Sequence, residues 1–360
     1  MAAAAPVETR FSPLTAIFQR PDSPRLQNYC YFCTLMQHFD HIINRLAPDL
    51  ERMNEIMRSH LATPNELMNR IVESYLSVKG KQIRPLLVML SARFFGGVND
   101  DTLHAGAALE MLHNASLIHD DVVDETLLRR GVDTVNAVWG NHLAVLVGDF
   151  FVSNALAAGI RTGHLAVISA LSALGKELSL GEVDQICNAR DHNLDEQSYI
   201  DMIRKKTASL FMNCVRMGAQ TAGASDTQIA PMVDYAELLG IAFQIRDDIF
   251  DYFDDPRIGK PTGNDLREGK VSLPLLYAMR ADSTSCRAEK MRGLIRRGDL
   301  STEEIDTLVE FAKAEGGIDY AFEYMRRLQR RGNTILENYP DSEWRRAFAD
   351  LFEFIIARDR

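Results

Sequence analysis

Asp120-Asp121-Val122-Val123-Asp124 and Asp247-Asp248-Ile249-Phe250-Asp251 are two copies of one acidic motif, Asp-Asp-x-x-Asp, in a chain of 360 residues. Residues i and i+4 lie on the same face of a helix, so each copy directs its first and last carboxylates towards one place. Like charges at this spacing destabilise a helix unless a cation lies between them. Mg2+ suits that position, because it takes one or two carboxylates and completes its coordination with substrate phosphates. One copy would fit a solvated helix face equally well, but two copies predict a metal and diphosphate site.

Basic residues stand around both motifs in the sequence. They are Lys81, Arg84, Arg129, Arg130, Lys205, Lys206, Lys260 and Lys270. Arg binds phosphate oxygens through a bidentate fork, and Lys binds them as a point charge. Because the whole chain has a net charge of −10, attraction for a polyanionic substrate has to come from this local set. The same net charge argues against nucleic acid as a partner.

With these residues the chain resembles the trans-isoprenyl diphosphate synthases, or polyprenyl synthetases, from about Leu61 to the C-terminus. The segments that carry the resemblance are Gly80-Lys81-Gln82-Ile83-Arg84-Pro85, His119 to Asp124 with Arg129-Arg130-Gly131, Gly148-Asp149-Phe150, Lys206-Thr207, Phe243-Gln244 and Gly259 to Lys270. The last segment is most similar to the long-chain branch, which makes octaprenyl, solanesyl and similar products. The resemblance implies an all-α, single-domain helical bundle of the isoprenoid synthase type with a central cavity, and a homodimer.

The resemblance also implies the reaction. A Mg2+-dependent prenyltransferase would condense isopentenyl diphosphate head-to-tail with an allylic diphosphate, giving a long all-trans polyprenyl diphosphate for a quinone side chain or a similar lipid. The allylic diphosphate has to ionise, which needs cations around the leaving group. Isopentenyl diphosphate keeps its diphosphate, so its pocket is expected to rely on guanidinium forks rather than on metal. Released pyrophosphate is the expected base for the final proton.

Roles for individual residues follow from the same resemblance. Metal would contact Asp120, Asp124 and Asp247 most directly, with Asp121, Asp248 and Asp251 in support. The residues expected to hold the allylic diphosphate are Arg129, Lys206, Lys260 and Lys270. Those expected to hold isopentenyl diphosphate are Lys81, Arg84, His113 and Arg130. The expected stabilisers of the carbocation are the Thr207 hydroxyl, the Gln244 amide oxygen and the backbone carbonyl of Lys206. His113 would also fit as an ordinary helix histidine.

Product length is expected to be set beside the helix that precedes the first motif. Leu109, Leu112 and Ser116 follow one face of that helix, leading from the metals towards its N-terminus. Ala115 and Ser116 are small, whereas short-chain relatives commonly carry an aromatic residue there, so the path is expected to stay open beyond the farnesyl length. Leu109, Leu112 and Phe151 are candidates for its floor. A leucine stripe of this kind would also fit ordinary core packing.

The composition favours one large domain without a membrane span. Hydrophobic residues make up 46% of the chain, and we expect a single domain over residues 41–360 after a partly loose tail and lead-in over residues 1–40. The five cysteines are too few and too scattered for a disulfide framework, and Cys30-x-x-Cys33 lacks the second pair that zinc needs. Asp149 interrupts the longest apolar stretch. We therefore expect a cytoplasmic location, with only peripheral membrane contact for product release.

Helical periodicity dominates, and no strand pattern is found. Capping boxes at Thr63-Pro64-Asn65-Glu66 and Ser301-Thr302-Glu303-Glu304 predict helix starts, and Pro85 opens a helix that stops at Gly96-Gly97. Further helices are expected near 102–130, 136–160, 165–187, 196–221 and 227–253. Residues 254–270 break the pattern with Pro, Gly and charged residues. Because they directly follow a metal motif, they predict a lid over the substrate rather than a simple connector.

Several other functions remain open from the sequence. A short-chain farnesyl or geranylgeranyl diphosphate synthase would share every motif except the open tail path. A class I terpene cyclase would not need Lys81, Arg84 and Arg130 as a second diphosphate site, nor a second Asp-Asp-x-x-Asp. A non-catalytic subunit of a heteromeric prenyl synthase usually loses an acidic motif, and both are intact here. A purely structural helical protein would leave the paired motifs unexplained.

Overall fold

The computed structural model describes residues 24–77, 82–129, 131–253, 262–281 and 285–358, with side chains from residue 41 onwards. Three of the predicted diphosphate ligands, Lys81, Arg130 and Lys260, lie outside these ranges. So does the first part of the predicted lid, residues 254–261.

The described residues form helices almost throughout, which confirms the predicted all-α class. The elements are α1 (Pro24–Leu61), α2 (Glu66–Ser77), α3 (Ile83–Phe95), α4 (Asp100–Val123), β1 (Leu128–Arg129), β2 (Val132–Asp133), α5 (Val135–Trp139), α6 (Asn141–Arg161), α7 (Leu165–Arg190), α8 (Glu196–Ile203), the π-helical turn η2 (Arg204–Ala208), α9 (Ser209–Thr221), α10 (Asp226–Phe250), α11 (Asn264–Arg267), α12 (Leu273–Ala281), α13 (Cys286–Arg297), α14 (Thr302–Ala314), α15 (Gly317–Leu336) and α16 (Glu343–Ala357).

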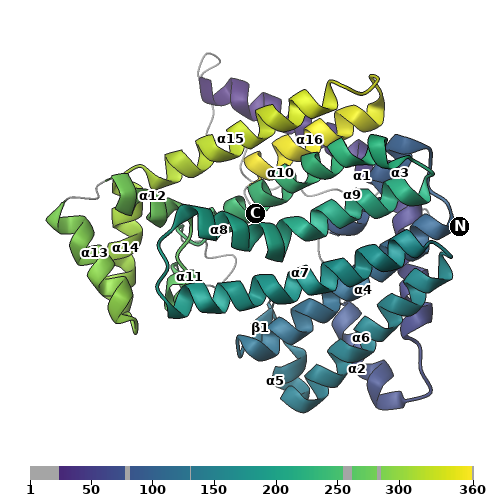
Figure 1. Ribbon diagram of the computed structural model, residues 1–360, viewed down its shortest axis with the longest axis horizontal. Helices are drawn as coiled ribbons and strands as arrows, with labels where there is room; N and C mark the ends of the chain where they lie inside the picture. Colours follow the sequence, from purple (N-terminus) through teal and green to yellow (C-terminus); the bar gives the residue numbers. More distant parts are fainter. Residues whose placement is uncertain (1–23, 78–81, 130, 254–261, 282–284, 359–360) are drawn as a thin grey trace, which may run out of the picture.

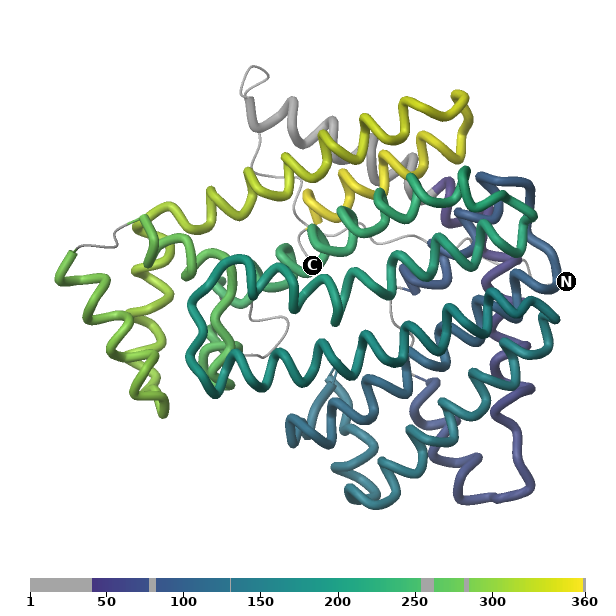
Figure 2. Tube along the Cα trace, in the orientation of Figure 1, coloured from purple at the N-terminus to yellow at the C-terminus, as the bar shows by residue number. Residues whose placement is uncertain are grey.

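Four long helices, α4, α7, α9 and α10, run alongside one another through the middle of the molecule (Figures 1 and 2). α6 packs along α4, while α15 and α16 pack on α10. The apolar side chains between these helices form the main core, and a second, smaller core joins α12, α13 and α14 at one end of the bundle. The two acidic motifs lie at the C-terminal ends of central helices, because α4 ends at Val123 and α10 at Phe250.

The helix that carries the first motif ends earlier than the sequence predicts. α4 stops at Val123, where Asp124 is the C-cap residue and Glu125 takes a positive φ of 50°. Instead of continuing to Arg130 as a helix, the chain forms an antiparallel hairpin in which β1 pairs with β2. The prediction of no strand was therefore wrong at this place. Strands of two residues carry too little alternation for a sequence pattern to reveal them.

Two other predicted helices are each divided. Gly140 separates α5 from α6 with a φ of 81°, a conformation that glycine adopts without steric cost. The segment predicted as one helix over 196–221 contains η2 between α8 and α9. A π-helical turn inserted between helices often marks a functional site.

The predicted capping boxes have different outcomes. The box at Ser301 and Glu304 is present at the start of α14. At α2 the prediction was wrong by two residues, because the side chain of Asn65, rather than that of Thr63, accepts from the Met68 N–H at 3.0 Å. Asn is as good an N-cap residue as Ser or Thr, so the sequence alone did not distinguish the two positions.

α6 is the one helix in the described ranges that is long and apolar enough to cross a membrane, and 39% of its apolar window is buried inside the protein. It lies close against α4 at Gly148, where a Cβ atom would come within 2.2 Å of the His119 ring. Core helices of soluble proteins pass the same length and composition test, so this helix is weak evidence for a span.

Candidate active site

The first acidic motif divides its carboxylates between two directions. Asp121 is buried, and its Oδ1 accepts from Arg129, with Nη2 at 2.7 Å and Nε at 2.8 Å. Asp120 is half-buried; burial, together with the charges of Glu182 and Asp124, raises its pKa to about 6. Asp120 and Asp124 therefore share a crowded negative region, whereas Asp121 is committed to a protein contact.

The second motif shows a similar division. Asp248 is buried and accepts one hydrogen bond on each oxygen, from the Tyr199 hydroxyl at 2.6 Å and from Gln244 Nε2 at 2.7 Å. Burial raises the pKa of Asp248 to about 7, and the two hydrogen bonds act in the opposite direction. Asp247 forms an ion pair with Arg358, yet 40% of its side chain is exposed. The first carboxylate of this motif thus stays accessible, and the second is engaged inside the protein.

The described end of the predicted lid connects the two motifs. The Asp251 carboxylate accepts from the backbone N–H groups of Asn264 and Asp265, at 3.0 and 3.1 Å. A few residues later, Lys270 Nζ lies 3.7 Å from the Asp124 carboxylate. This segment therefore contacts the second motif at one end and the first motif at the other.

The turn η2 carries Lys206 and Thr207 between α7 and α10. A Cβ atom on Gly181 of α7 would lie 2.7 Å from the backbone nitrogen of Lys206, and one on Gly240 of α10 would lie 2.6 Å from Ala208 Cα. Real Cβ atoms do not approach other atoms so closely. The two glycines therefore allow both long helices to press directly on the backbone of the turn.

Lys206 is held by two polar side chains of α7. Its Nζ forms an ion pair with Glu182 and donates to Gln185 Oε1 at 2.9 Å. Gln185 in turn donates from Nε2 to Glu182 Oε1, also at 2.9 Å. The charge of Lys206 lowers the pKa of Asp120, opposing the larger effect of burial. The ammonium group is thus fixed beside the first motif.

Thr207 and Gln244, both predicted to stabilise a carbocation, are in direct contact. The Thr207 hydroxyl donates to Gln244 Oε1 at 2.6 Å. With Lys206, Asp248 and Lys270, these two residues line a cavity of about 230 Å3. Groups from η2, from the second acidic motif and from the end of the predicted lid therefore face one polar space.

Arg84 and His113 are the described members of the predicted isopentenyl diphosphate pocket. His113 is buried on α4, with 6% of its surface exposed. The Arg84 guanidinium lies 5.9 Å from the ring centroids of both Phe211 and Phe243. Because Phe243 directly precedes Gln244, α3 brings Arg84 to the same part of α10 that carries the predicted carbocation stabiliser.

The residues predicted to control product length lie on α4 and on α6, which packs along it. Those on one face of α4 are Leu109, Leu112 and Ser116. Leu112 and Ser116 are half-buried, whereas Leu109 is completely buried. Ala115 is also enclosed, at 1% exposure. Phe151 of α6 packs edge-on against Tyr75 of α2, with ring centroids 5.7 Å apart. Phe151 therefore contacts α2 while lying on a helix that packs along α4.

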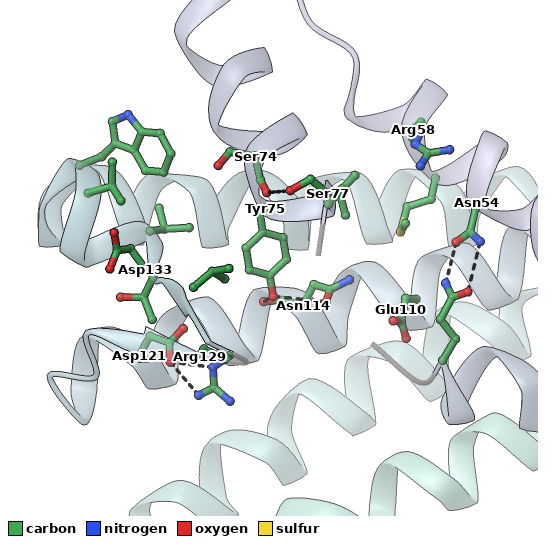
Figure 3. A pocket seen from close by; sticks show the side chains of 18 residues that line it. Asn54, Arg58, Ser74, Tyr75, Ser77, Glu110, Asn114, Asp121, Arg129 and Asp133 are labelled. Atoms are coloured by element: carbon green, nitrogen blue, oxygen red, sulfur yellow. Dashed lines mark hydrogen bonds and ion pairs between the residues drawn. The ribbon is translucent and has the colours of Figure 1, made fainter. Parts of the chain in front are cut away.

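A larger cavity, of about 440 Å3, opens on another face of α4 (Figure 3). Glu110, Asn114 and Asp121 direct their side chains to it at spacings of four and seven residues, which keeps them on one face of the helix. Tyr75 and Arg129 line it from α2 and from the hairpin. The cavity meets the first motif at the ion pair of Asp121 and Arg129, so it lies beside the acidic site and not within it.

The donor set of the two motifs fits a hard divalent cation. Asp120, Asp124 and Asp247 offer carboxylate oxygens, which Mg2+ and Ca2+ prefer. A cation would also relieve the negative crowding that raises the pKa of Asp120. Among the described residues, no three acidic, His or Cys side chains are already gathered around one point. Substrate phosphates would therefore have to complete the coordination, as is usual for Mg2+.

The sequence matches the family model for polyprenyl synthetase over residues 65–312. The chain belongs to the polyprenyl synthetase family. The octaprenyl diphosphate synthase of Escherichia coli (strain K12) is 34% identical to it over 320 residues, which cover 88% of this chain and 98% of that relative. The predicted resemblance to this family is confirmed.

Solved structures agree with this family assignment. The polyprenyl synthase from Caulobacter crescentus CB15, complexed with calcium and isoprenyl diphosphate, has a TM-score of 0.83 and 31% identity, covering 89% of this chain and 98% of that one. The geranylgeranyl pyrophosphate synthase from Bacteroides thetaiotaomicron has a TM-score of 0.77 and 35% identity, covering 89% and 100%. The fold is that of an isoprenoid synthase, and the protein is a prenyltransferase.

Several residues of this prenyltransferase site were not singled out in the sequence. They are Gly181, Glu182, Gln185, Tyr199 and Arg358. A local signal exists for the first three, because Gly181-Glu182-x-x-Gln185 places a glycine and two polar groups on one turn of a long apolar helix. No local signal marks the other two, whose carboxylate partners are 49 and 111 residues away in the chain.

Proposed function

We propose that this protein is a Mg2+-dependent synthase that condenses isopentenyl diphosphate head-to-tail with an allylic diphosphate to make a long all-trans polyprenyl diphosphate. The observation that carries the proposal is that two lysines lie at the first acidic motif, Lys206 beside Asp120 and Lys270 beside Asp124, while Asp251 of the second motif binds the segment that leads to Lys270. A diphosphate in this region would be approached by cations from several sides. Neutralising its charge lowers the barrier to its departure.

Asp120, Asp124 and Asp247 would hold the Mg2+ ions, which supply charge neutralisation at the leaving diphosphate. The related Caulobacter crescentus polyprenyl synthase is complexed with calcium, which supports a hard, oxygen-seeking cation. The supporting carboxylates Asp121, Asp248 and Asp251 would bind protein groups rather than metal. Each accepts from a side chain or from backbone N–H groups. Lys206 and Lys270 would bind phosphate oxygens directly, helped by Arg129 and by Lys260.

Isopentenyl diphosphate would bind in a second pocket, against Arg84 and His113. Lys81 and Arg130 would be the other ligands of its diphosphate. This assignment is supported by the position of the Arg84 guanidinium beside Phe243. A guanidinium can hold a diphosphate through two parallel hydrogen bonds without promoting its departure.

The reaction would begin when the allylic C–O bond breaks and its electron pair leaves with the diphosphate. The oxygens of Thr207, Gln244 and the Lys206 carbonyl would face the resulting cation. The double bond of isopentenyl diphosphate would then attack the cationic carbon, and a proton would pass to the released pyrophosphate. In this scheme the protein positions lone pairs and excludes water, and no protein base is needed.

A long product is supported by the side chains along α4. Leu112 and Ser116 remain half-buried on the face that leads away from the first motif, and no aromatic residue stands at Ala115 or Ser116. A short-chain farnesyl or geranylgeranyl synthase is the second candidate, because the chain is similar both to a named octaprenyl synthase and to a named geranylgeranyl synthase. A long product would serve a quinone side chain or a similar lipid.

The direct test is a product assay. Purified protein would be incubated with Mg2+, isopentenyl diphosphate and one allylic primer at a time, and the dephosphorylated products would be sized. We expect all-trans chains longer than geranylgeranyl. Products that stop at farnesyl or geranylgeranyl would support the second candidate, and an absence of any product would refute the proposed activity.

We also propose a homodimer formed through α6 and α7. These consecutive helices contact each other, and together they carry eight exposed large apolar residues. They are Val145, Leu146, Leu156, Ile160, Leu165, Leu180, Val183 and Ile186. Many exposed large apolar side chains on two neighbouring helices are typical of a protein interface.

Sedimentation velocity would test the dimer. Leu146→Glu should shift the protein towards the monomer, whereas the matched control Leu67→Glu, on the exposed side of α2, should leave the dimer intact. A monomeric wild-type protein would contradict the proposal.

We further propose a cytoplasmic location and a single catalytic domain over residues 41–360, with peripheral membrane contact restricted to product release.

A further inference from the structure

Four side chains form a continuous chain of hydrogen bonds behind the predicted reaction centre. The Tyr199 hydroxyl lies 2.6 Å from Asp248 Oδ2, Gln244 Nε2 lies 2.7 Å from Asp248 Oδ1, and the Thr207 hydroxyl lies 2.6 Å from Gln244 Oε1. The chain begins on α8, crosses α10 and ends on η2. Tyr199 is 4% exposed and Asp248 8%, so water does not compete strongly for these bonds.

Each hydrogen bond has a defined direction. The Gln244 amide nitrogen can only donate, so Asp248 Oδ1 accepts from it and thereby fixes which way the amide points. Gln244 Oε1 is consequently directed towards Thr207 and accepts its hydroxyl proton. The Thr207 hydroxyl proton then points at Gln244, and the lone pairs of the Thr207 oxygen point away from Gln244. An amide turned the other way would set two acceptors against each other at Asp248, and Thr207 would have to accept from the amide instead of donating to it.

We infer that Tyr199 is a positioning residue for ionisation of the allylic substrate, acting through Asp248 and Gln244 to orient the oxygens of Gln244 and Thr207 towards the developing cation. Tyr199 does not touch the substrate in this account. Its hydroxyl occupies Asp248 Oδ2, which leaves Oδ1 as the acceptor for the Gln244 amide. The inference rests on the proposed function, because it needs a cation at the end of the chain of hydrogen bonds.

The middle aspartate of the second motif thereby has a role distinct from metal binding. Asp248 has both oxygens engaged by protein donors, whereas its neighbour Asp247 is 40% exposed. Oriented dipoles that are fixed before reaction stabilise developing charge without reorganising. The motif would therefore supply both a metal ligand and an anchor for the carbocation stabilisers.

The test compares two buried tyrosines that lose the same atom. Tyr199→Phe removes the hydroxyl that bonds Asp248, and Tyr252→Phe removes one that bonds Ser272 at 3.0 Å in the same region. Ionisation alone is measured by following an 18O label from the bridging to the non-bridging oxygens of the allylic diphosphate, with an unreactive analogue of isopentenyl diphosphate bound. In this exchange the C–O bond breaks, the diphosphate rotates and the bond re-forms.

Tyr199→Phe is expected to slow the exchange about tenfold or more, with the Michaelis constants of both substrates within about twofold of wild type. Tyr252→Phe is expected to change the exchange less than about twofold. A double-mutant cycle adds a check that a simple packing effect would not pass: Tyr199→Phe should have little further effect in a Thr207→Val background, because both act on the same group of oxygens.

Equal exchange rates for the two phenylalanine variants would overturn the inference, as would effects of Tyr199→Phe and Thr207→Val that multiply independently. Wild-type protein that forms no prenyl product would instead refute the proposed function, so the two failures are distinguishable. Far-ultraviolet circular dichroism and thermal melting would establish that each variant is folded.

Discussion

Arg358, the last residue that the structure describes, forms an ion pair with Asp247, the first residue of the second acidic motif. The two lie 111 residues apart in the chain. The Arg358 side chain is also stacked 4.2 Å from the centroid of the Phe243 ring, and its backbone carbonyl accepts from Arg246 Nε at 3.1 Å. The C-terminal end of the described chain therefore lies against the predicted metal-binding region.

The positive charge of Arg358 should compete with metal at Asp247, because a cation binds less well beside a fixed cation. We predict that Arg358→Gln lowers the Mg2+ concentration needed for half of the thermal stabilisation seen with inorganic pyrophosphate, by several-fold. The baseline melting temperature should fall, since the buried guanidinium, its ion pair and its ring contact are lost. Arg358→Lys, which keeps the charge, is the matched control. An unchanged or higher Mg2+ midpoint in Arg358→Gln would contradict this role.

Gly240 allows α10 to approach the turn that carries Lys206 and Thr207. In Gly240→Ala the new Cβ would lie 2.6 Å from Ala208 Cα, so the turn has to move. We predict a loss of about 1–3 kcal/mol of unfolding free energy from overpacking and a fall in turnover of at least tenfold. Gly175→Ala on α7 is the control, since a Cβ there meets nothing within 4 Å. That variant should be as stable as wild type or up to about 1 kcal/mol more stable. Normal turnover in Gly240→Ala would show that the close approach is not needed.

Replacing Arg84 tests whether the two substrates bind at separate sites. Arg84→Ala is predicted to raise the Michaelis constant for isopentenyl diphosphate at least tenfold and that for the allylic primer by less than about threefold, because a bidentate contact is lost from one pocket. Arg93→Ala on the same helix removes a guanidinium that pairs with Asp49 at 2.7 Å, and it should change neither constant. Steady-state kinetics with each substrate varied in turn would measure this. Equal increases for both substrates in Arg84→Ala would argue against separate sites.

Substitutions at Ser116 test the path that the growing prenyl chain takes. Ser116→Phe would fill the space about one helical turn, roughly 5.4 Å, from Asp120. We predict products limited to farnesyl or geranylgeranyl length, with the first condensation close to normal because the acidic motif is untouched. Ser116→Ala removes the hydroxyl without adding bulk and should make the wild-type product. Ala115→Phe is a harsher variant, because Ala115 is only 1% exposed and the ring would have to displace core side chains.

The chain-length distribution at limiting enzyme is the measurement for these variants. If Ser116→Phe folds, remains active and still makes the full-length product, the chain does not pass along this face of α4. The accessible surface at Leu112 and Ser116 would then need another explanation, such as a water-filled space.

The helices around the acidic motifs were predictable because their signals are local. The apolar periodicity around the motifs indicated helices, which the structure confirms, and the i, i+4 spacing of the carboxylates predicts a diphosphate site. The division of labour inside each motif was not predictable. Whether Asp121 turns to Arg129, or Asp248 to Tyr199, depends on how α4 ends in a hairpin and how α8 packs against α10.

Contacts between distant segments account for the other differences. Arg358 reaches Asp247 only because α16 packs against α10, and the helical periodicity of the sequence does not predict that contact. The edge-on contact of Phe151 with Tyr75 of α2 likewise joins segments far apart in the chain. Side-chain direction around a helix decides such cases, and it is fixed by tertiary packing.

The claim that the acidic motifs hold the catalytic cations has the most direct test in isosteric variants of their accessible carboxylates. Asp120→Asn and Asp247→Asn each keep the size of the side chain and remove its charge, and Asp234→Asn does the same at an exposed position of α10 away from the site. Single-turnover rates of the first condensation, at saturating Mg2+ and both substrates, would be compared. We predict a loss of several orders of magnitude for Asp120→Asn and for Asp247→Asn, and no change for Asp234→Asn, because neutralisation of the leaving diphosphate acts on the transition state. A folded Asp120→Asn or Asp247→Asn protein with near-normal turnover would contradict it.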